Sequence, residues 1–297
     1  MQTKLRAVLL KPLPILLISL LSLPIIVGFA WVFISTFSRR IYGLMPVTPD
    51  GSFGGLTLEN WSFLVTDIAI WKLTLNTFLL ATGLSIGIIL VSSLAAYPLS
   101  RMKFPGRKGY LSLTLVLHAF PSVTLLIAIY FVLRWISRIP IIGNDLPIIG
   151  GFGYNTLGGV ILVEMAFLLP LGVWLMKGFF DNISWDLERA ALIDGCSRFR
   201  TWRQILMPQI RPGLAALGIF AFMHGWSSFL VPYTFMLDGK TAVISTYLND
   251  LTSGLQTINY GEVAAVGLFQ LVPILLFYTF TQKYLLTIFG GGMKGGA

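Results

Sequence analysis

The sequence predicts an all-α polytopic membrane protein with six transmembrane helices. Of its 297 residues, 56% are hydrophobic and only 11% are charged, whereas a soluble domain carries about 25% charged residues. Several apolar runs exceed the ~18 residues that cross a bilayer as a helix, and the alternating segments typical of membrane barrels are absent from the sequence. We expect residues 1–297 to form a single transmembrane domain, with spans at residues 13–37, 73–99, 110–136, 157–176, 213–236 and 263–286.

The first span follows Lys4, Arg6 and Lys11, as the apolar core of a signal peptide would. The apolar run is too long for that core, and no small-x-small cleavage site follows it. We therefore expect an uncleaved membrane anchor.

The distribution of Lys and Arg predicts the orientation of the spans. Basic residues gather at the N-terminus, in residues 101–108, in the loop 177–212 and in the tail 287–297, whereas the opposite side holds most of the acidic residues. Cytoplasmic loops are rich in Lys and Arg. Both termini are therefore expected in the cytoplasm.

The net charge of +9 does not indicate a nucleic-acid-binding protein, because the basic residues lie in short loops at the ends of spans. The single cysteine, Cys196, excludes an internal disulfide. His118 and His224 are far apart, and no Cys/His cluster has the spacing of a metal site. We expect no catalytic, cofactor or metal site in this chain.

The longest polar stretch between two spans predicts a helical hairpin over residues 184–212, which we call the polar hairpin. Ser184 can cap a first helix, and Gly195 supplies the left-handed position that ends it. Ser197 can cap a second helix, which Pro208 and Pro212 end before the fifth span. One face of the first helix is expected to carry Leu187, Ala190, Ala191 and Asp194.

Physical chemistry alone leaves two interpretations of the polar hairpin open. It can lie on the membrane surface as an amphipathic element, with Arg198, Arg200 and Arg203 on lipid phosphates. It can instead dock onto a soluble partner protein through a face whose alanines permit close approach.

The pattern Glu-x-Ala-Ala-x-x-x-Gly followed by Pro resembles the "EAA loop" of binding-protein-dependent ABC importer permeases. The chain keeps these positions of the loop: Ala190, Ala191, Asp194, Gly195, Pro208 and Pro212. It departs by placing Arg189 where the family has an acidic residue, with Glu188 one position earlier. Residues 95–106, 169–180 and 290–295 resemble the same regions of carbohydrate permeases of the maltose type.

This resemblance implies a permease subunit of an ATP-driven carbohydrate importer in the inner membrane of a prokaryote. The implied partners are a second permease, two ATPase subunits that hold ATP and Mg²⁺, and an external solute-binding protein. The chain has no Gly-x-x-x-x-Gly-Lys-Ser/Thr motif of its own for nucleotide phosphates.

The resemblance also assigns expected contacts. The residues expected to dock the ATPase are Glu188, Arg189, Ala190, Ala191, Asp194, Gly195 and Pro208, with Met293 and Lys294 of the tail as a further contact. Arg189 in the acidic position implies an acidic residue in the ATPase cleft. The residues expected to contact the binding protein are Asn249, Asp250, Thr252, Gln256 and Asn259, for which a plain connecting loop is the alternative.

Polar residues inside the spans are candidates for the substrate path. Glu164 is costly at membrane depth when charged, so it either serves function, packs inward against His118 or a tyrosine, or is protonated. The other candidates, which can line a sugar path or join helices, are His224, Trp226, Ser227 and Ser228.

Three other functions are weaker alternatives. An ABC importer for glycerol phosphate needs a cationic site in the path, and the spans contain no buried Arg or Lys. A self-sufficient secondary transporter needs ion sites and broken helices, and an intramembrane enzyme needs a catalytic motif around Glu164 and His118.

Overall fold

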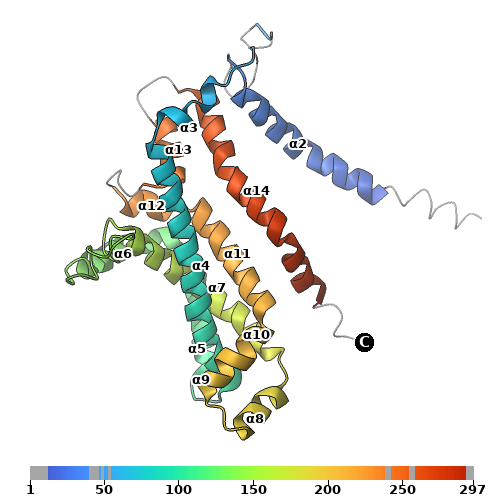
Figure 1. The fold of residues 1–297 in the computed structure, drawn as a ribbon, viewed down its shortest axis with the longest axis vertical. Helices are drawn as coiled ribbons and strands as arrows, with labels where there is room; N and C mark the ends of the chain where they lie inside the picture. Colours follow the sequence, from blue (N-terminus) through green and yellow to red (C-terminus); the bar gives the residue numbers. More distant parts are fainter. Residues whose placement is uncertain are drawn as a thin grey trace, which may run out of the picture. The chain divides into compact units, whose positions relative to one another are not determined.

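A computed structural model describes residues 13–39, 47, 50–52, 55–237, 242–253 and 258–291, and the regular elements of this part of the chain are helices (Figure 1). These elements are α2 (Leu13–Thr36), η1 (Glu59–Trp61), α3 (Phe63–Thr66), α4 (Ala69–Arg101), α5 (Arg107–His118), α6 (Ser122–Ile136), α7 (Leu157–Asp181), α8 (Trp185–Ile193), α9 (Arg198–Thr201), η2 (Trp202–Leu206), α10 (Met207–Gln209), α11 (Arg211–Ser227), α12 (Leu230–Phe235), α13 (Ile244–Ser253) and α14 (Tyr260–Gly291).

The contacts divide the chain into two compact units. Unit 1 comprises Met1–Ile70 with Leu248–Val272, and unit 2 comprises Trp71–Tyr247 with Pro273–Ala297. The expectation of a single transmembrane domain stays a prediction.

Four of the described helices, α2, α4, α7 and α14, are long and apolar enough to cross a membrane, and the number rises to six if each of two bent helix pairs is one span. The bent pairs are α5 with α6, at 102°, and Arg198–Gln209 with α11, at 79°. Each of the six predicted spans overlaps one or two of the described helices, and four of them overlap a single long helix.

Two of the predicted spans are interrupted, which the sequence did not predict. Residues 110–136 break between α5 and α6 just before Ser122, where Pro121 is extended and has no backbone N–H for a helix. Residues 213–236 break at Ser228, whose backbone is extended between α11 and α12.

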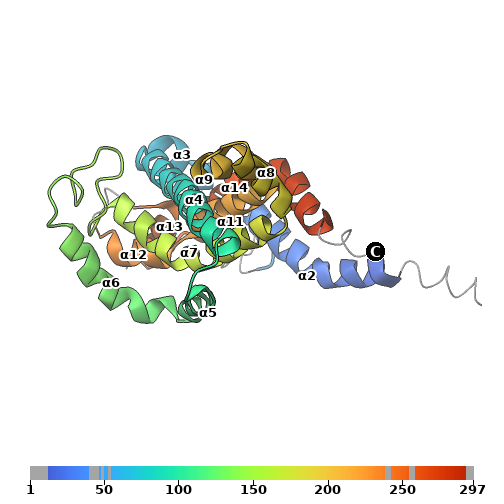
Figure 2. The ribbon, with the colours of Figure 1, turned by 90° about the horizontal axis from the view of Figure 1, so that it is seen from below.

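Small residues let three long helices of unit 2 approach one another. Gly172 of α7 lies against Ser92 of α4, and a Cβ built on Gly225 of α11 would lie 2.9 Å from the Cα of Ala81 on α4. Such contacts between glycines and small residues are typical of packed membrane helices. In both views α6 and the loop after it lie to one side of these three helices (Figure 2).

In unit 1, a side-chain amide of η1 forms hydrogen bonds with the end of α2. Asn60 in η1 donates from Nδ2 to the carbonyl oxygens of Thr36 and Ser38, at 3.0 and 3.1 Å, and so holds the end of α2. Phe63 of α3 meets Phe269 of α14 edge to face, with ring centroids 6.1 Å apart.

Candidate functional site

The polar hairpin is built by local capping that the sequence predicted correctly. The Ser184 hydroxyl accepts from the backbone N–H of Asp186 at 3.2 Å, and the Ser197 hydroxyl accepts from that of Arg200 at 3.3 Å. Gly195 has φ +81° and ends α8, and the N–H of Cys196 donates to the Ala191 carbonyl at 3.0 Å. This is a closed helix end of the Schellman type, so the turn between α8 and α9 is fixed by its own backbone.

Glu188 turns inward from α8. It is only 2% exposed, and its Oε1 accepts from the hydroxyl of Tyr97 at 2.8 Å. Its Oε2 lies 3.5 Å from Nε of Arg101, and Nη1 of Arg198 lies 3.6 Å from Oε1. The 3.5 Å contact is an ion pair without a formed hydrogen bond. Glu188 therefore connects the polar hairpin to the end of α4 and does not contribute to its outer face.

Arg101 completes this connection. Its side chain is fully buried, and its Nη2 donates to the carbonyl oxygens of Phe180 and Ile183, at 2.5 and 2.7 Å, where α7 ends. Its guanidinium also stacks on the ring of Trp185, 4.7 Å from the centroid. The sequence indicates Arg101 only as a loop charge, because its partners lie about 80 positions away along the chain.

An apolar core backs the second arm of the polar hairpin. Trp202, Leu206 and Ile210 are buried in the same cluster as Tyr97 of α4 and Phe180 of α7. The rings of Tyr97 and Phe180 meet edge to face at 5.9 Å. The arm is therefore continuous with the packed interior of unit 2, and it lies with α8 at one end of that unit (Figure 1).

The outer face of α8 is apolar at its centre. Ile193 is 85% exposed and Leu187 is 39% exposed, with Ala190 exposed between them and Asp194 beside them. The prediction that Ala191 shares this face is wrong: Ala191 is buried, because it lies one turn from the inward-facing Glu188.

Arg189, which stands in the acidic position of the motif, is solvent-exposed. Its side chain is 70% exposed and lies 3.5 Å from that of Asp186, which is 85% exposed. Exposed pairs of this kind contribute little to stability, so Arg189 is available to a partner.

Pro208 does not end the second arm as predicted. It lies inside α10, directly after the π-helical turn η2, and the helical run continues to Gln209. A proline leaves the carbonyl four residues earlier without its donor, and a widened π turn is one way in which a helix accommodates a local irregularity. The bend comes at Ile210, just before Pro212 in the first turn of α11.

A second polar cluster lies within the helices of unit 2. Glu164 of α7 is 3% exposed. Its Oε2 lies 3.0 Å from Nε2 of His224 on α11, and its Oε1 accepts from the hydroxyl of Ser228. The cluster joins α7 to the end of α11.

The remaining path candidates, which are neighbours of this cluster on α11, make other contacts. Trp226 is 2% exposed and stacks on Phe222, and the hydroxyl of Ser227 donates to the backbone carbonyl of Met223. The alternative in which Glu164 pairs with His118 is wrong, because Glu164 contacts His224 and Ser228. Nδ1 of His118, at the end of α5, lies 3.3 Å from the carbonyl oxygen of Phe167.

The candidate contacts to a binding protein are in part helical. Asn249, Asp250 and Thr252 lie on α13, with Asp250 and Thr252 exposed. Asn259 accepts from the N–H groups of Gly261 and Glu262 and caps α14. Gln256, Met293 and Lys294 fall outside the described residues.

Residues 83–286 match the family described as binding-protein-dependent transport system inner membrane component. The chain belongs to this family. It is therefore a membrane permease component of a binding-protein-dependent transport system, and the subunits of this family are not catalytic.

The permease is similar to curated proteins over most of its length. A diacetylchitobiose uptake system permease protein of Streptomyces coelicolor is 30% identical, over 90% of this chain and 83% of that protein. A maltose/maltodextrin transport system permease protein of Salmonella typhimurium is 31% identical, over 74% of this chain and 71% of that protein.

A solved structure supports the fold of the permease. The crystal structure of a bacterial ABC transporter involved in the import of the acidic polysaccharide alginate has a chain that matches with a TM-score of 0.73. The match has 15% identity and covers 92% of this chain and 95% of that chain.

Proposed function

We propose that this permease carries an oligosaccharide or a related carbohydrate inward as one subunit of an ABC importer. The names of the relatives support this substrate class, since one imports diacetylchitobiose and the other maltose and maltodextrins. The proposed partners are a second, different permease subunit, two ATPase subunits that hold ATP and Mg²⁺, and an external binding protein.

The polar hairpin is the proposed docking element for one ATPase subunit. The observation that carries this proposal is the contrast between its two faces: Leu187, Ala190 and Ile193 are exposed, while Glu188 and Ala191 on the opposite side are buried. Large exposed apolar side chains beside charges are typical of a protein-binding surface. Arg189 and Asp194 border this apolar stripe and set the charge that the partner must match.

Motion of the ATPase reaches the membrane helices through the base of the polar hairpin. Glu188 and Arg101 connect α8 to α4 and to the end of α7, and Trp202 and Leu206 pack into the interior of unit 2. Because packed cores move as discrete units, displacement of the hairpin displaces the ends of α4, α7 and α11 together. The proposed result is alternating access of the substrate path.

The cluster of Glu164, His224 and Ser228 is the proposed polar junction next to that path. The side chain of His224 is 43% exposed, so a passing sugar can reach its ring. Glu164 is covered and serves to hold His224 and Ser228. The contacts of α13 and Asn259 with a binding protein, and of Met293 and Lys294 with the ATPase, remain part of this proposal.

Replacement of the most exposed apolar residue tests the docking proposal. Ile193→Asp places a charge at the centre of the stripe, and we expect at least ~30-fold weaker retention of the ATPase subunits during co-purification, because a central contact contributes about 2 kcal/mol or more. Thr66→Asp is the control, since it adds the same charge at an exposed position on α3, outside the polar hairpin, and should retain the ATPase. Full ATPase retention and full sugar uptake by Ile193→Asp would contradict the proposal.

A further inference from the structure

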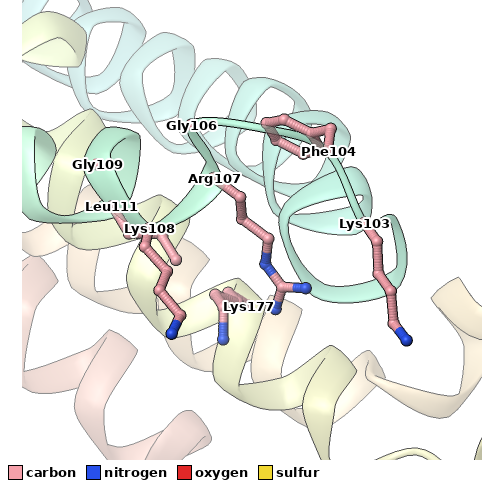
Figure 3. A pocket seen from close by; sticks show the side chains of 8 residues that line it. All are labelled: Lys103, Phe104, Gly106, Arg107, Lys108, Gly109, Leu111 and Lys177. Carbon is pink, nitrogen blue, oxygen red and sulfur yellow. The ribbon is translucent and has the colours of Figure 1, made fainter.

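A basic hollow lies at the junction of α4, α5 and α7, and none of its lining residues belongs to the two clusters described above. It has a volume of about 630 Å³, and four basic side chains line it: Lys103, Arg107, Lys108 and Lys177. Their nitrogen atoms point toward the same side of the hollow (Figure 3). The walls between them are backbone and apolar side chains, among them Leu111.

Little in the described part of the chain neutralises this charge. Lys177 is paired with Asp181 at 2.5 Å, and Nη1 of Arg107 donates to the carbonyl of Met102 at 3.3 Å. Lys103 and Lys108 have neither an ion pair nor a side-chain hydrogen bond among the residues that the structure describes. The hollow therefore carries an excess of positive charge that an anion can neutralise.

The backbone adds to the attraction for an anion. α5 begins at Arg107, after Gly106 in the left-handed conformation, and no side chain caps its N-terminus. The first N–H groups of a helix favour phosphate and other anions. They add here to the two free lysines, which are an independent feature of the same hollow.

The position of the hollow indicates which class of anion fits it. It lies where α4, a helix long enough to span the membrane, ends at Arg101. The outer face of α5 next to it exposes Tyr110, Leu113 and Leu117 by 45%, 53% and 54%. A ligand with a phosphate and hydrocarbon chains satisfies both surfaces at once, as expected of basic pockets between membrane helices.

We propose that the basic hollow binds the headgroup of an anionic phospholipid from the leaflet on this side of the membrane. The phosphate lies between Lys103, Lys108 and the N-terminus of α5, and the acyl chains lie along the apolar face of α5. The bound lipid fixes the link between α4 and α5 against the end of α7. This site is separate from the docking face of the polar hairpin and does not depend on the transported solute.

Lipid binding by the purified full-length chain tests the proposal. Phosphatidylglycerol and phosphatidylcholine are titrated in detergent, and bound lipid is counted by native mass spectrometry. We expect a clear preference for phosphatidylglycerol, and Lys103→Gln with Lys108→Gln should weaken its binding about 30-fold, since each basic residue near an anionic lipid surface contributes a factor of about five. Lys103→Arg with Lys108→Arg keeps the charge and should restore binding.

A charge-matched control separates this site from general attraction. Lys72→Gln with Arg138→Gln removes the same charge from exposed positions outside the hollow and should change phosphatidylglycerol binding less than twofold. An equal loss in both double variants, or no preference between the two lipids, would overturn the proposal.

Two further measurements distinguish a bound lipid from other occupants of the hollow. Displacement of the lipid by inorganic phosphate, but not by chloride at equal ionic strength, would assign the hollow to free phosphate. Normal lipid binding together with loss of co-purified ATPase in the Lys103 and Lys108 double variant would assign it to a protein partner. Either result would overturn the lipid site.

Discussion

At the scale of single residues, the carboxylate of Glu188 forms three polar contacts at the base of the polar hairpin. It contacts Tyr97, Arg101 and Arg198 while only 2% exposed. Removing one partner of a buried ion pair leaves the other charge without compensation, which costs about 3–5 kcal/mol. The neutral form of this residue should therefore weaken the connection between α8 and α4.

We expect Glu188→Gln to lower the thermal unfolding midpoint of the purified chain by several degrees. Glutamine retains the size of the side chain and an oxygen for Tyr97 but removes the negative charge that pairs with Arg101. In the assembled transporter, the same variant should hydrolyse ATP with less sugar uptake per ATP, because the polar hairpin no longer moves α4. Fluorescence-monitored unfolding and uptake in vesicles measure these two effects.

Asp186→Asn is the control for this prediction. It removes the same charge two residues away, but Asp186 is 85% exposed and its ion pair is with the exposed Arg189. Its unfolding midpoint and uptake should stay close to those of the original chain. Equal behaviour of Glu188→Gln and Asp186→Asn would show that burial of Glu188 has no role in coupling.

A second residue-scale prediction concerns Glu164. Glutamine at this position can still accept from Ser228 and hydrogen-bond His224, so Glu164→Gln should keep uptake within about threefold, since hydrogen bonds between membrane helices average about 0.6 kcal/mol. Glu164→Leu leaves both partners unsatisfied, and such unpaired groups cost about 1–3 kcal/mol each. It should therefore lower the unfolding midpoint and the yield of protein. A large loss of uptake in a stable Glu164→Gln would instead show that the charge itself acts in transport.

At the scale of elements, the polar hairpin separates what sequence can predict from what it cannot. The caps at Ser184 and Ser197 and the turn at Gly195 are local, so residue type and spacing predicted them correctly. The division of α8 into an inner and an outer face depends on α4, since Glu188 contacts a tyrosine 91 positions away. No local pattern contains that information, and the predicted face was therefore only partly correct.

Replacement of Gly195 tests the rigidity of this element. Gly195 has φ +81°, and a Cβ at this position would meet no other atom within 4 Å, so a substitution is limited by backbone conformation alone. Asparagine tolerates the left-handed region, and Gly195→Asn should keep uptake. Gly195→Val costs about 1–2 kcal/mol or more at this φ and should reduce uptake at equal expression. If the two variants showed equal uptake, the turn would not need a residue that tolerates the left-handed backbone conformation.

At the scale of the whole molecule, composition was sufficient to predict the membrane class, whereas the bounds of the six spans stay predictions. Composition did not predict the bends at 102° and 79° or the division into two units. Hydropathy counts apolar residues along the chain. A bend depends instead on which neighbouring groups form hydrogen bonds with the backbone groups that the interruption of the helix leaves free. The orientation of the spans is predicted from the Lys and Arg distribution, and labelling of one residue tests it.

The single cysteine of the chain provides that test without any substitution. Cys196 is a free thiol, partly exposed, in the turn of the polar hairpin. If the basic side of the permease is cytoplasmic, a membrane-impermeant maleimide should label Cys196 in inside-out vesicles and not in intact spheroplasts. Cys196→Ser with Ser253→Cys moves the thiol to an exposed position on α13 and should reverse the pattern. Assembly with the ATPase should then protect Cys196 but not the cysteine at position 253, because the docked subunit covers the polar hairpin and not α13. Labelling of Cys196 from the outside would invert the orientation and, with it, the side on which the ATPase can bind.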